Sequence, residues 1–328
     1  MRVRVNEARK KCELILQKKG ISKEESKIIA DEYIEGELLG KKSHGLQAFP
    51  ALVKKLDKLP ERWTVEKETD SMVFIDARGY FGEVVGKVAA EMACKKAAKE
   101  GIGMVAVKDM LTWLRPRTPA RAIAEKGMVG IVVNNGGKEA IAPSGGIDPI
   151  LGTNPIGIGI PSKGGVISFD MATSKRAWGE VRIAKALGIA LPDESFLDKK
   201  GEYTRNADEV HSAVPFGDYK GYALAFLIEI LTGSLVNMPM GAGKTAGDYR
   251  TALRGAIVIA IDPSKLTNLN EFKRRNYEFA GQIKASRRQK DVEEIYIPGE
   301  KSELRRKKSI DAGEIDVDKS IWDEIKKL

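Results

Sequence analysis

The sequence is poor in the residues that bind metals and form disulfide bonds. Its 328 residues include two histidines, His44 and His211, and two cysteines, Cys12 and Cys94. Two histidines are too few for a site built from several of them, so we expect no metal site. Both cysteines fall on apolar helical positions, which predicts buried thiols rather than a disulfide bond. A cytoplasmic location follows by default.

Long apolar runs are also missing. No run approaches the roughly 20 residues that a membrane-spanning helix needs. The first residues, MRVRVN, lack the apolar region of a signal peptide. We therefore expect no membrane partner.

The charge balance is basic but mixed. The 55 basic residues are interleaved with 46 acidic ones, for a net charge of +9. The densest basic run, Arg305-Arg306-Lys307-Lys308, is short and lies in a charged helical pattern. This favours a solvated face over a nucleic-acid site, and it suits a small anionic substrate or an anionic cofactor.

The usual fingerprints of nucleotide binding are absent. Gly101-x-Gly103-x-x-Ala106 resembles the dinucleotide motif, but it leads from a helix into a strand, the reverse of the required order. The segment 241–245 resembles the end of a phosphate loop, but it lacks the first glycine and follows a helix. Both matches are rejected.

The pattern of apolar residues predicts an α/β fold. Expected strands cover 72–76, 104–108, 129–133, 256–261 and 295–297, and expected helices cover 6–19, 46–56, 83–99, 175–188, 222–235 and 272–286. Thr118 and Pro119 are expected to start a further helix as N-cap and first residue. The helix at 222–235 is apolar nearly all round, which predicts that it is buried. We expect a helical segment at 1–70 that packs with a C-terminal helical segment at 266–328, and a sheet and cofactor-binding region at 71–265.

One hairpin stands at the centre of this arrangement. Strands 156–160 and 166–170 are expected on either side of a turn at 161–165, and loops of small residues flank the pair at 152–155 and 171–174. Small residues let a ligand approach the backbone closely. The pattern alone is equally that of an ordinary hairpin.

His44 is a second candidate functional residue. It lies in a turn between two helices, beside Ser43 and Gly45, at the N-terminus of the second helix. The helix dipole there disfavours the imidazolium form and tunes the group for proton exchange. Sequence spacing leaves both a catalytic and a structural role open, whereas His211 lies in a charged segment and is expected to be exposed.

Seven short segments, taken in order, make the chain similar to a known family. They are Lys42-Ser43-His44-Gly45, Asp76-x-x-Gly79-x-x-Gly82-x-x-x-Gly86, Ala142-Pro143-x-Gly145-Gly146, Leu151-Gly152-Thr153-Asn154-Pro155-Ile156, Phe169-Asp170-Met171-Ala172-Thr173-Ser174, Lys220-Gly221-Tyr222 and Ile297-Pro298-Gly299-Glu300. In this order they resemble the type 2 malate/L-lactate dehydrogenase family, with its ureidoglycolate, sulfolactate, diketogulonate and piperideine-2-carboxylate relatives. The resemblance covers nearly the whole chain.

The resemblance implies a non-Rossmann fold that binds NAD or NADP in a central sheet, a homodimer, and hydride transfer to or from a small 2-oxo or 2-hydroxy acid or a cyclic imine acid. By matching position, His44 is the proton donor. The implied cofactor contacts are Val166, Ile167, Ser168, Phe169, Asp170, Met171, Ala172, Tyr219, Lys220, Gly299 and Glu300. Thr153, in the loop before the hairpin, is a candidate substrate contact.

The substrate half of the pattern departs from the family. An arginine usually follows the motif histidine by four residues and grips the substrate carboxylate, but here that position is Ala48. An Asn-His pair is replaced by Leu111 and Thr112, and a Gly-Lys pair by Gly179 and Glu180.

Two explanations stay open. In the first, the enzyme acts on a different substrate, Arg115 or Arg117 supplies the missing carboxylate clamp, and Trp113 adds an aromatic wall. In the second, the chain binds the dinucleotide without turnover and serves as a binding or regulatory protein. The alternative for the two arginines is exposure on a loop.

Overall fold

The computed structural model describes residues 1–111, 113, 115–136, 138–243 and 253–328. Thr112, expected at the position of the family's second histidine, lies outside the described residues, as do Lys244 and Thr245 of the rejected phosphate-loop match at 241–245.

The core of the protein is a mixed sheet of seven strands in the order β2-β3-β4-β10-β5-β6-β7. Only β3 and β4 pair in parallel, and the remaining neighbours are antiparallel. The strands are β2 (Thr64–Glu68), β3 (Met72–Asp76), β4 (Ile102–Met110), β5 (Val129–Asn134), β6 (Ile156–Ser162), β7 (Gly165–Met171) and β10 (Arg254–Ile261). The hairpin expected at the centre of the chain is therefore β6 and β7, and β7 forms one edge of the sheet.

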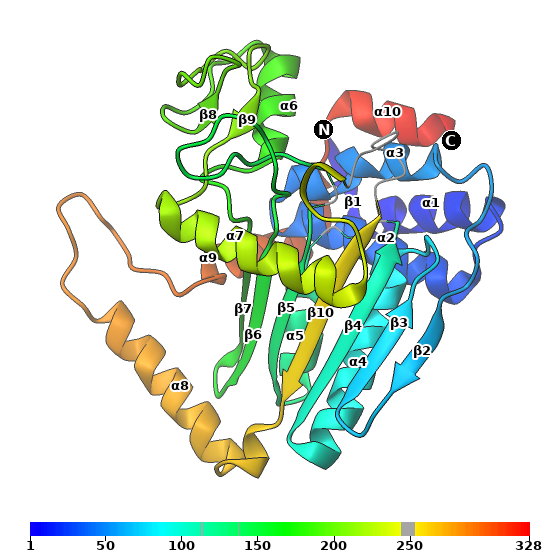
Figure 1. Cartoon of the computed structure of the whole chain (residues 1–328), viewed down its shortest axis with the longest axis vertical. Helices are drawn as coiled ribbons and strands as arrows, with labels where there is room; N and C mark the ends of the chain where they lie inside the picture. Colours follow the sequence, from blue (N-terminus) through cyan, green and yellow to red (C-terminus); the bar gives the residue numbers. More distant parts are fainter. Residues whose placement is uncertain (112, 114, 137, 244–252) are drawn as a thin grey trace.

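Helices cover both faces of this sheet (Figure 1). Helices α4 (Gly82–Glu100) and α5 (Arg117–Glu125) pack on one face, and α7 (Tyr219–Thr232) packs on the other face against β4, β5 and β10. Alternate residues of β10 show the two layers, because Val258 joins the cluster on the α4 side and Ile257 the smaller cluster with Ile228 of α7.

The two ends of the chain lie together. Strand β1 (Arg2–Arg4) pairs with β11 (Glu314–Asp316), and Arg306 of α9 forms an ion pair with Glu35 of α2 at 3.0 Å. The helices of these ends are α1 (Val5–Lys18), α2 (Lys23–Leu38), α3 (Phe49–Val53), α9 (Glu300–Ala312) and α10 (Lys319–Lys327). The domain boundaries near residues 70 and 265 stay a prediction.

Two further parts extend beyond the sheet. Helix α6 (Trp178–Leu187) and the short pair β8 (Phe196–Leu197) and β9 (Ser212–Ala213) form a lobe that Figure 1 shows above β6 and β7. Helix α8 (Leu269–Lys284) projects on the other side and contacts the β6–β7 turn, where the Asn276 amide donates to the Pro161 carbonyl at 3.0 Å.

Glycines bring α5 unusually close to the sheet. A Cβ on Gly159 of β6 would lie 2.1 Å from the carbonyl oxygen of Ala120, and one on Gly130 of β5 would lie 2.6 Å from the same atom. A Cβ on Gly157 would lie 2.4 Å from the carbonyl carbon of Pro116. No residue other than glycine fits these strand positions without moving the helix.

Several local predictions are wrong at the ends of elements. The helix expected at 46–56 is a 3₁₀ turn, Leu46–Ala48, followed by the short α3. Helix α5 begins at Arg117 with Pro116 as N-cap, not with Thr118, because the Thr118 hydroxyl donates to Glu32 at 2.7 Å instead. Residues 295–297 form no strand, and α6 begins at Trp178 rather than 175.

Helix α7 is not fully buried as predicted. Ala225, Ile228, Glu229 and Thr232 are buried, but Phe226 and Leu227 are 52% and 51% exposed. By length and composition alone, residues 219–236 are long and apolar enough to cross a membrane. Since one face of α7 packs on the sheet, we interpret its other, apolar face as an interaction surface.

The close approach of α5 predicts a sharp stability loss for Gly159→Ala. The added Cβ must displace Ala120, and overpacking of this kind costs about 1–3 kcal/mol. Thermal unfolding followed by circular dichroism measures the change. Gly281→Ala is the control, since a Cβ there meets nothing within 4 Å and helical alanine is favoured over glycine. Equal midpoints for Gly159→Ala and the parent would contradict the packing.

Candidate active site

His44 ends a 3₁₀ turn, Lys42–His44, that lies against helix α2. A Cβ on Gly36 of α2 would lie only 2.4 Å from the His44 carbonyl oxygen, so the helix and the turn touch backbone to backbone. A Cβ on Gly45 would lie 2.4 Å from Oε1 of Glu37. Two glycines thus allow the turn to sit directly on the helix.

The carboxylate of Glu37, on helix α2, holds the backbone just after this turn. Its Oε1 accepts the backbone N–H of Leu46 at 2.7 Å. Glu37 is 9% exposed, and burial raises its pKa to about 7. The hydrogen bond satisfies a donor of the 3₁₀ turn that follows His44, so Glu37 fixes the position of the backbone from which the imidazole extends.

The imidazole of His44 makes one hydrogen bond among the described residues, between Nδ1 and the Ser43 hydroxyl at 2.9 Å. Burial, then the positive charge of Arg115, lowers its pKa to about 4, against an opposing effect of Asp170. The ring is therefore neutral at neutral pH.

A cavity of about 580 Å³ opens beside His44. It lies between the His44 turn, the loops after β5 and β7, the loop before β6, and the start of α6. Of the site residues expected from the sequence, it is lined by His44, Arg115, Thr153, Asp170, Met171 and Ala172. The structure thus brings together expected site residues from four separate parts of the chain.

The cavity is rich in positive charge. Five cationic side chains and two carboxylates line it: Lys41, Arg115, Lys138, Arg182 and Arg254, with Glu139 and Asp170. This balance favours an anionic ligand.

Among the described residues, Oδ1 of Asn134, at the end of β5, and Nη1 of Arg115 are buried atoms of this lining without a hydrogen-bond partner. Both side chains are 3% exposed. Since a buried polar atom without a partner is costly, an acceptor and a donor are available to a ligand here. Sequence analysis missed Asn134, whose only signal was its place where a buried strand meets a polar loop.

Arg115 and Arg117 are both buried, so the alternative that they lie exposed on a loop is wrong. Nη2 and Nε of Arg115 are held by the Glu32 carboxylate at 2.8 and 3.0 Å, and Nη2 also donates to the Glu32 carbonyl. Arg117 pairs with Glu303 and donates from Nε to the Ser168 carbonyl at 3.2 Å. Arg115 lines the His44 cavity, whereas Arg117 lines a different one. The geometry therefore supports only Arg115 as a clamp.

Strand β7 carries most of the expected cofactor contacts along the edge of the sheet. Ser168 is buried, and its Oγ has no hydrogen-bond partner in the part of the chain that the structure describes. Gly299 lies against this point, since a Cβ there would be 2.0 Å from the Ser168 carbonyl oxygen, and its φ is +86°. Glu300, which follows, accepts the Ile297 N–H at 2.9 Å and pairs with Lys284 at 2.6 Å.

The other expected cofactor contacts lie further away. Tyr219 and Lys220, at the start of α7, are exposed, and the Lys220 ammonium lies 5.9 Å from the centre of the Tyr219 ring. Neither lines the His44 cavity.

Asn154 fixes the loop that carries Thr153. Its Oδ1 accepts the Gly136 N–H at 3.1 Å, and its Nδ2 donates to Glu229 at 2.7 Å and to the Ala225 carbonyl at 2.9 Å. The residue is fully buried with φ of +35°, a conformation that asparagine tolerates better than most residues. The loop is thereby tied to α7.

Two of the expected departures from the family pattern, Ala48 and the Gly179-Glu180 pair, lie close to His44. Ala48 lines the cavity, four residues after the histidine. Gly179 packs on Ser43, because a Cβ there would be 2.6 Å from the Ser43 Cβ, and Glu180 follows it in the first turn of α6. His211 is partly exposed and pairs with Asp148 at 3.1 Å, away from this cavity.

Comparisons with known proteins find relatives along nearly the whole chain. A family model described as malate/L-lactate dehydrogenase matches residues 3–326. The chain is 35% identical to malate/(S)-sulfolactate dehydrogenase of Methanothermus fervidus over 322 residues, which cover 96% of this chain and 93% of the relative. It is 25% identical to ureidoglycolate dehydrogenase (NAD(+)) of Escherichia coli K12, with 88% and 85% covered.

A relative that acts on cyclic imine acids, by its name, is the Δ1-pyrroline-2-carboxylate/Δ1-piperideine-2-carboxylate reductase of Pseudomonas aeruginosa, 29% identical with 81% of this chain and 82% of the relative covered. Among solved structures, sulfolactate dehydrogenase from Methanocaldococcus jannaschii superposes with a TM-score of 0.91 at 32% identity, covering 100% of this chain and 96% of that one.

The role of Glu37 predicts different results for two substitutions. Glu37→Ala removes the acceptor for the Leu46 N–H, so we expect faster hydrogen exchange at Leu46 and a loss of about 10²-fold in kcat/KM from the displaced His44. Glu37→Gln keeps an acceptor oxygen and should preserve both. Unchanged Leu46 exchange in the alanine variant would show that the carboxylate does not hold the turn.

Proposed function

The chain belongs to the malate/L-lactate dehydrogenase family, which makes it a nicotinamide-dependent dehydrogenase, and we propose that it moves a hydride to or from a small 2-oxo or 2-hydroxy acid or a cyclic imine acid with His44 as proton donor. The observation that carries this proposal is the cationic cavity in which His44 meets Arg115 and residues 170–172. An anionic substrate in this cavity would have His44 as its proton source and Arg115 as the partner of its carboxylate.

The residues along the edge of β7 and Asn134 at the end of β5 fit a nicotinamide cofactor. Asn134 offers an acceptor to a carboxamide N–H, and Ser168 offers a hydroxyl close to where Gly299 packs on the strand backbone; neither atom has a partner among the described residues. We propose that residues 166–172, Gly299 and Glu300 hold the cofactor along the edge of β7, with Tyr219 and Lys220 at its far end. Whether it is NAD or NADP is decided by the assay below.

Once bound, the cofactor supplies the hydride for reduction or accepts it in the reverse direction. Hydride addition to the C2 carbonyl carbon of a 2-oxo acid leaves an alkoxide, and His44 donates the proton that completes the hydroxyl group. In the reverse direction the neutral imidazole accepts that proton. Arg115 donates from Nη1 to the substrate carboxylate and so orients C2 within the cavity.

The experiment that tests this function combines cofactor and substrate. Nicotinamide fluorescence with NADH and NADPH measures binding, and reduction of 2-oxo acids and cyclic imine acids measures turnover. His44→Gln is expected to bind cofactor as the parent does and to lose about 10²–10⁴-fold in kcat, the range typical of a positioned acid. Absence of binding by either cofactor contradicts the proposal, whereas binding without turnover on any substrate identifies a dinucleotide-binding protein.

The pH dependence of the same reaction checks the state of His44. Because its pKa in the free protein is about 4, the imidazolium fraction grows as pH falls from 8 to 5. We expect kcat/KM for reduction to rise about tenfold for each unit by which the pH falls over this range, because the pKa of the proton-donating group lies below the range. A plateau below pH 6.5 would show an unshifted histidine.

We further propose that two copies associate through the exposed apolar face of α7. Phe226, Leu227 and Ile230 lie on this face and are all solvent-exposed in the single chain. Contiguous apolar surface of this kind marks an interface, and most soluble oligomers are symmetric homodimers.

Phe226→Glu tests this association, because a charge at the centre of the interface is expected to give monomers. Light scattering after size-exclusion chromatography measures the mass, and Glu278→Lys on the exposed side of α8 is the control for a surface charge change. A parent protein that is monomeric at micromolar concentration contradicts the proposal.

A further inference from the structure

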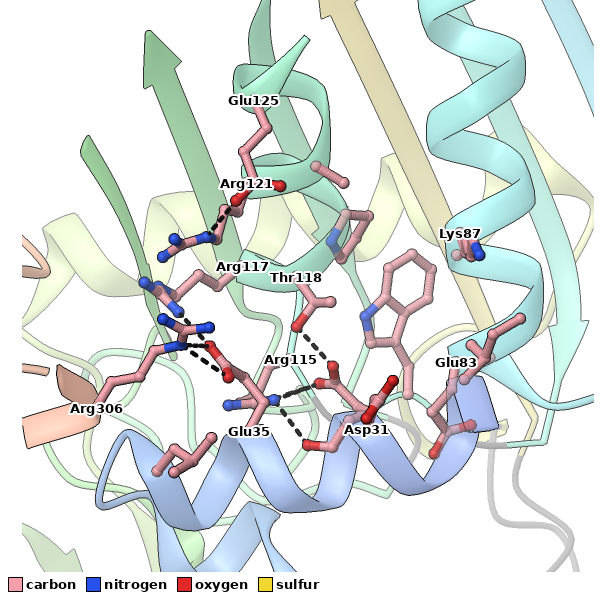
Figure 2. A pocket seen from close by; sticks show the side chains of 18 of the residues that line it. Asp31, Glu35, Glu83, Lys87, Arg115, Arg117, Thr118, Arg121, Glu125 and Arg306 are labelled. Atoms are coloured by element: carbon pink, nitrogen blue, oxygen red, sulfur yellow. Dashed lines mark hydrogen bonds and ion pairs between the residues drawn. The ribbon is translucent and has the colours of Figure 1, made fainter. Parts of the chain in front are cut away.

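A second cavity, of about 600 Å³, lies on the other side of Arg115 from His44. It is bounded by α2, α4, α5 and α9 (Figure 2). Two residues, Trp113 and Arg115, line both this cavity and the one beside His44. They therefore form a wall with a cavity on each side.

The charged groups of this second cavity are largely paired with one another. Figure 2 shows Arg117, Arg121 and Arg306 gathered on one side, opposite Glu83 and Lys87 of α4. The carboxylates that line it beside these arginines have partners: Glu35 with Arg306 at 3.0 Å, Glu125 with Arg121 at 2.8 Å, and Asp31 with Arg9 at 2.7 Å. Glu32 is held by Arg115 and Thr118.

Two donors are left over, and both carry positive charge. Nη1 of Arg115 has no hydrogen-bond partner, and Lys87 makes no ion pair among the described residues. The uncharged part of the lining is mainly apolar: Ile28, Leu38, Trp113, Pro119, Ala122 and Ile310. This combination suits an anion that also presents an apolar body, and the volume is within the range of about 300–1,000 Å³ typical of small-molecule sites.

We propose that this cavity binds a small organic carboxylate with an apolar or aromatic body, and that such a ligand competes with the substrate for Arg115. Nε and Nη2 of Arg115 are committed to Glu32, so only Nη1 is available. Arg115 lines both cavities, and two carboxylates bound to the two hydrogens of one N–H₂ group would lie close enough to repel each other. The ligand therefore weakens substrate binding from a separate site, and by linkage the substrate weakens ligand binding equally.

Binding is tested on the full chain without cofactor or substrate. The probe is 3-phenylpropionate, followed by isothermal titration calorimetry, with its neutral amide as the matched control. Ala122→Phe fills the second cavity, and Ala48→Phe fills the cavity beside His44. We expect Ala122→Phe to weaken probe binding at least tenfold, Ala48→Phe to leave it within about twofold, and the amide to bind at least tenfold more weakly than the acid.

Lys87→Glu gives an independent test at an exposed position, where a failure to fold is not at issue. It should weaken binding of the acid several-fold and leave the amide unchanged. The proposal is overturned if the probe does not bind, if the amide binds equally well, or if Ala48→Phe abolishes binding while Ala122→Phe does not. The last result would place the probe beside His44.

The competition for Arg115 rests on the proposed function and is tested separately, so that failure of the two can be told apart. In assays that contain cofactor and a 2-oxo acid that the enzyme reduces, the probe should raise KM and leave kcat unchanged in the parent. It should have no such effect in Ala122→Phe. Probe binding that leaves KM unchanged overturns the competition. If the protein shows no turnover, the proposed function fails, and the calorimetric titrations alone test whether the second cavity binds the probe.

Discussion

Helix α5 can pack against β5 and β6 only because no side chain stands between them. Three glycines in these strands bring their backbone into contact with Pro116 and Ala120. The segment that enters α5 is consequently pressed onto the sheet, and Trp113 and Arg115 are carried into the space between the sheet and α2. Both cavities exist because this segment divides one space into two, with His44 on one side and the arginines of α5 and α9 on the other.

The position of Arg115 in that wall depends on a charge on another element. Glu32 of α2 accepts from Nε and Nη2, and Thr118 donates to its second oxygen. Burial raises the pKa of Glu32, while Arg115 and Thr118 oppose the rise. A buried pair of this kind gives little net stability, so its value lies in fixing geometry. The Nη1 group is thereby held at a fixed position in the wall between the two cavities.

Local patterns in the sequence predicted the parts of the site that are local in the structure. The β6–β7 hairpin and the turn at His44 depend on glycine, proline and strand alternation within about 20 residues, and both were found where expected. Strand β3 was predicted to the residue. The burial of Arg115 was not predictable, because its partner Glu32 lies 83 residues earlier in the chain. The exposed face of α7 was missed because apolar periodicity shows that a helix has a face to cover, without showing what covers it.

The replacement of the family's arginine by Ala48 has a consequence for how a carboxylate is held. An arginine on the turn after His44 is free to present two N–H groups in a planar fork, whereas Arg115 has already given Nε and Nη2 to Glu32. A substrate carboxylate in this cavity therefore meets a single donor in a rigid position. The remaining hold must come from other cations of the lining, of which Arg182 stands on α6, in the lobe above β6 and β7. The proposed function thus places one carboxylate contact on a fixed group in the wall and another on a separate lobe.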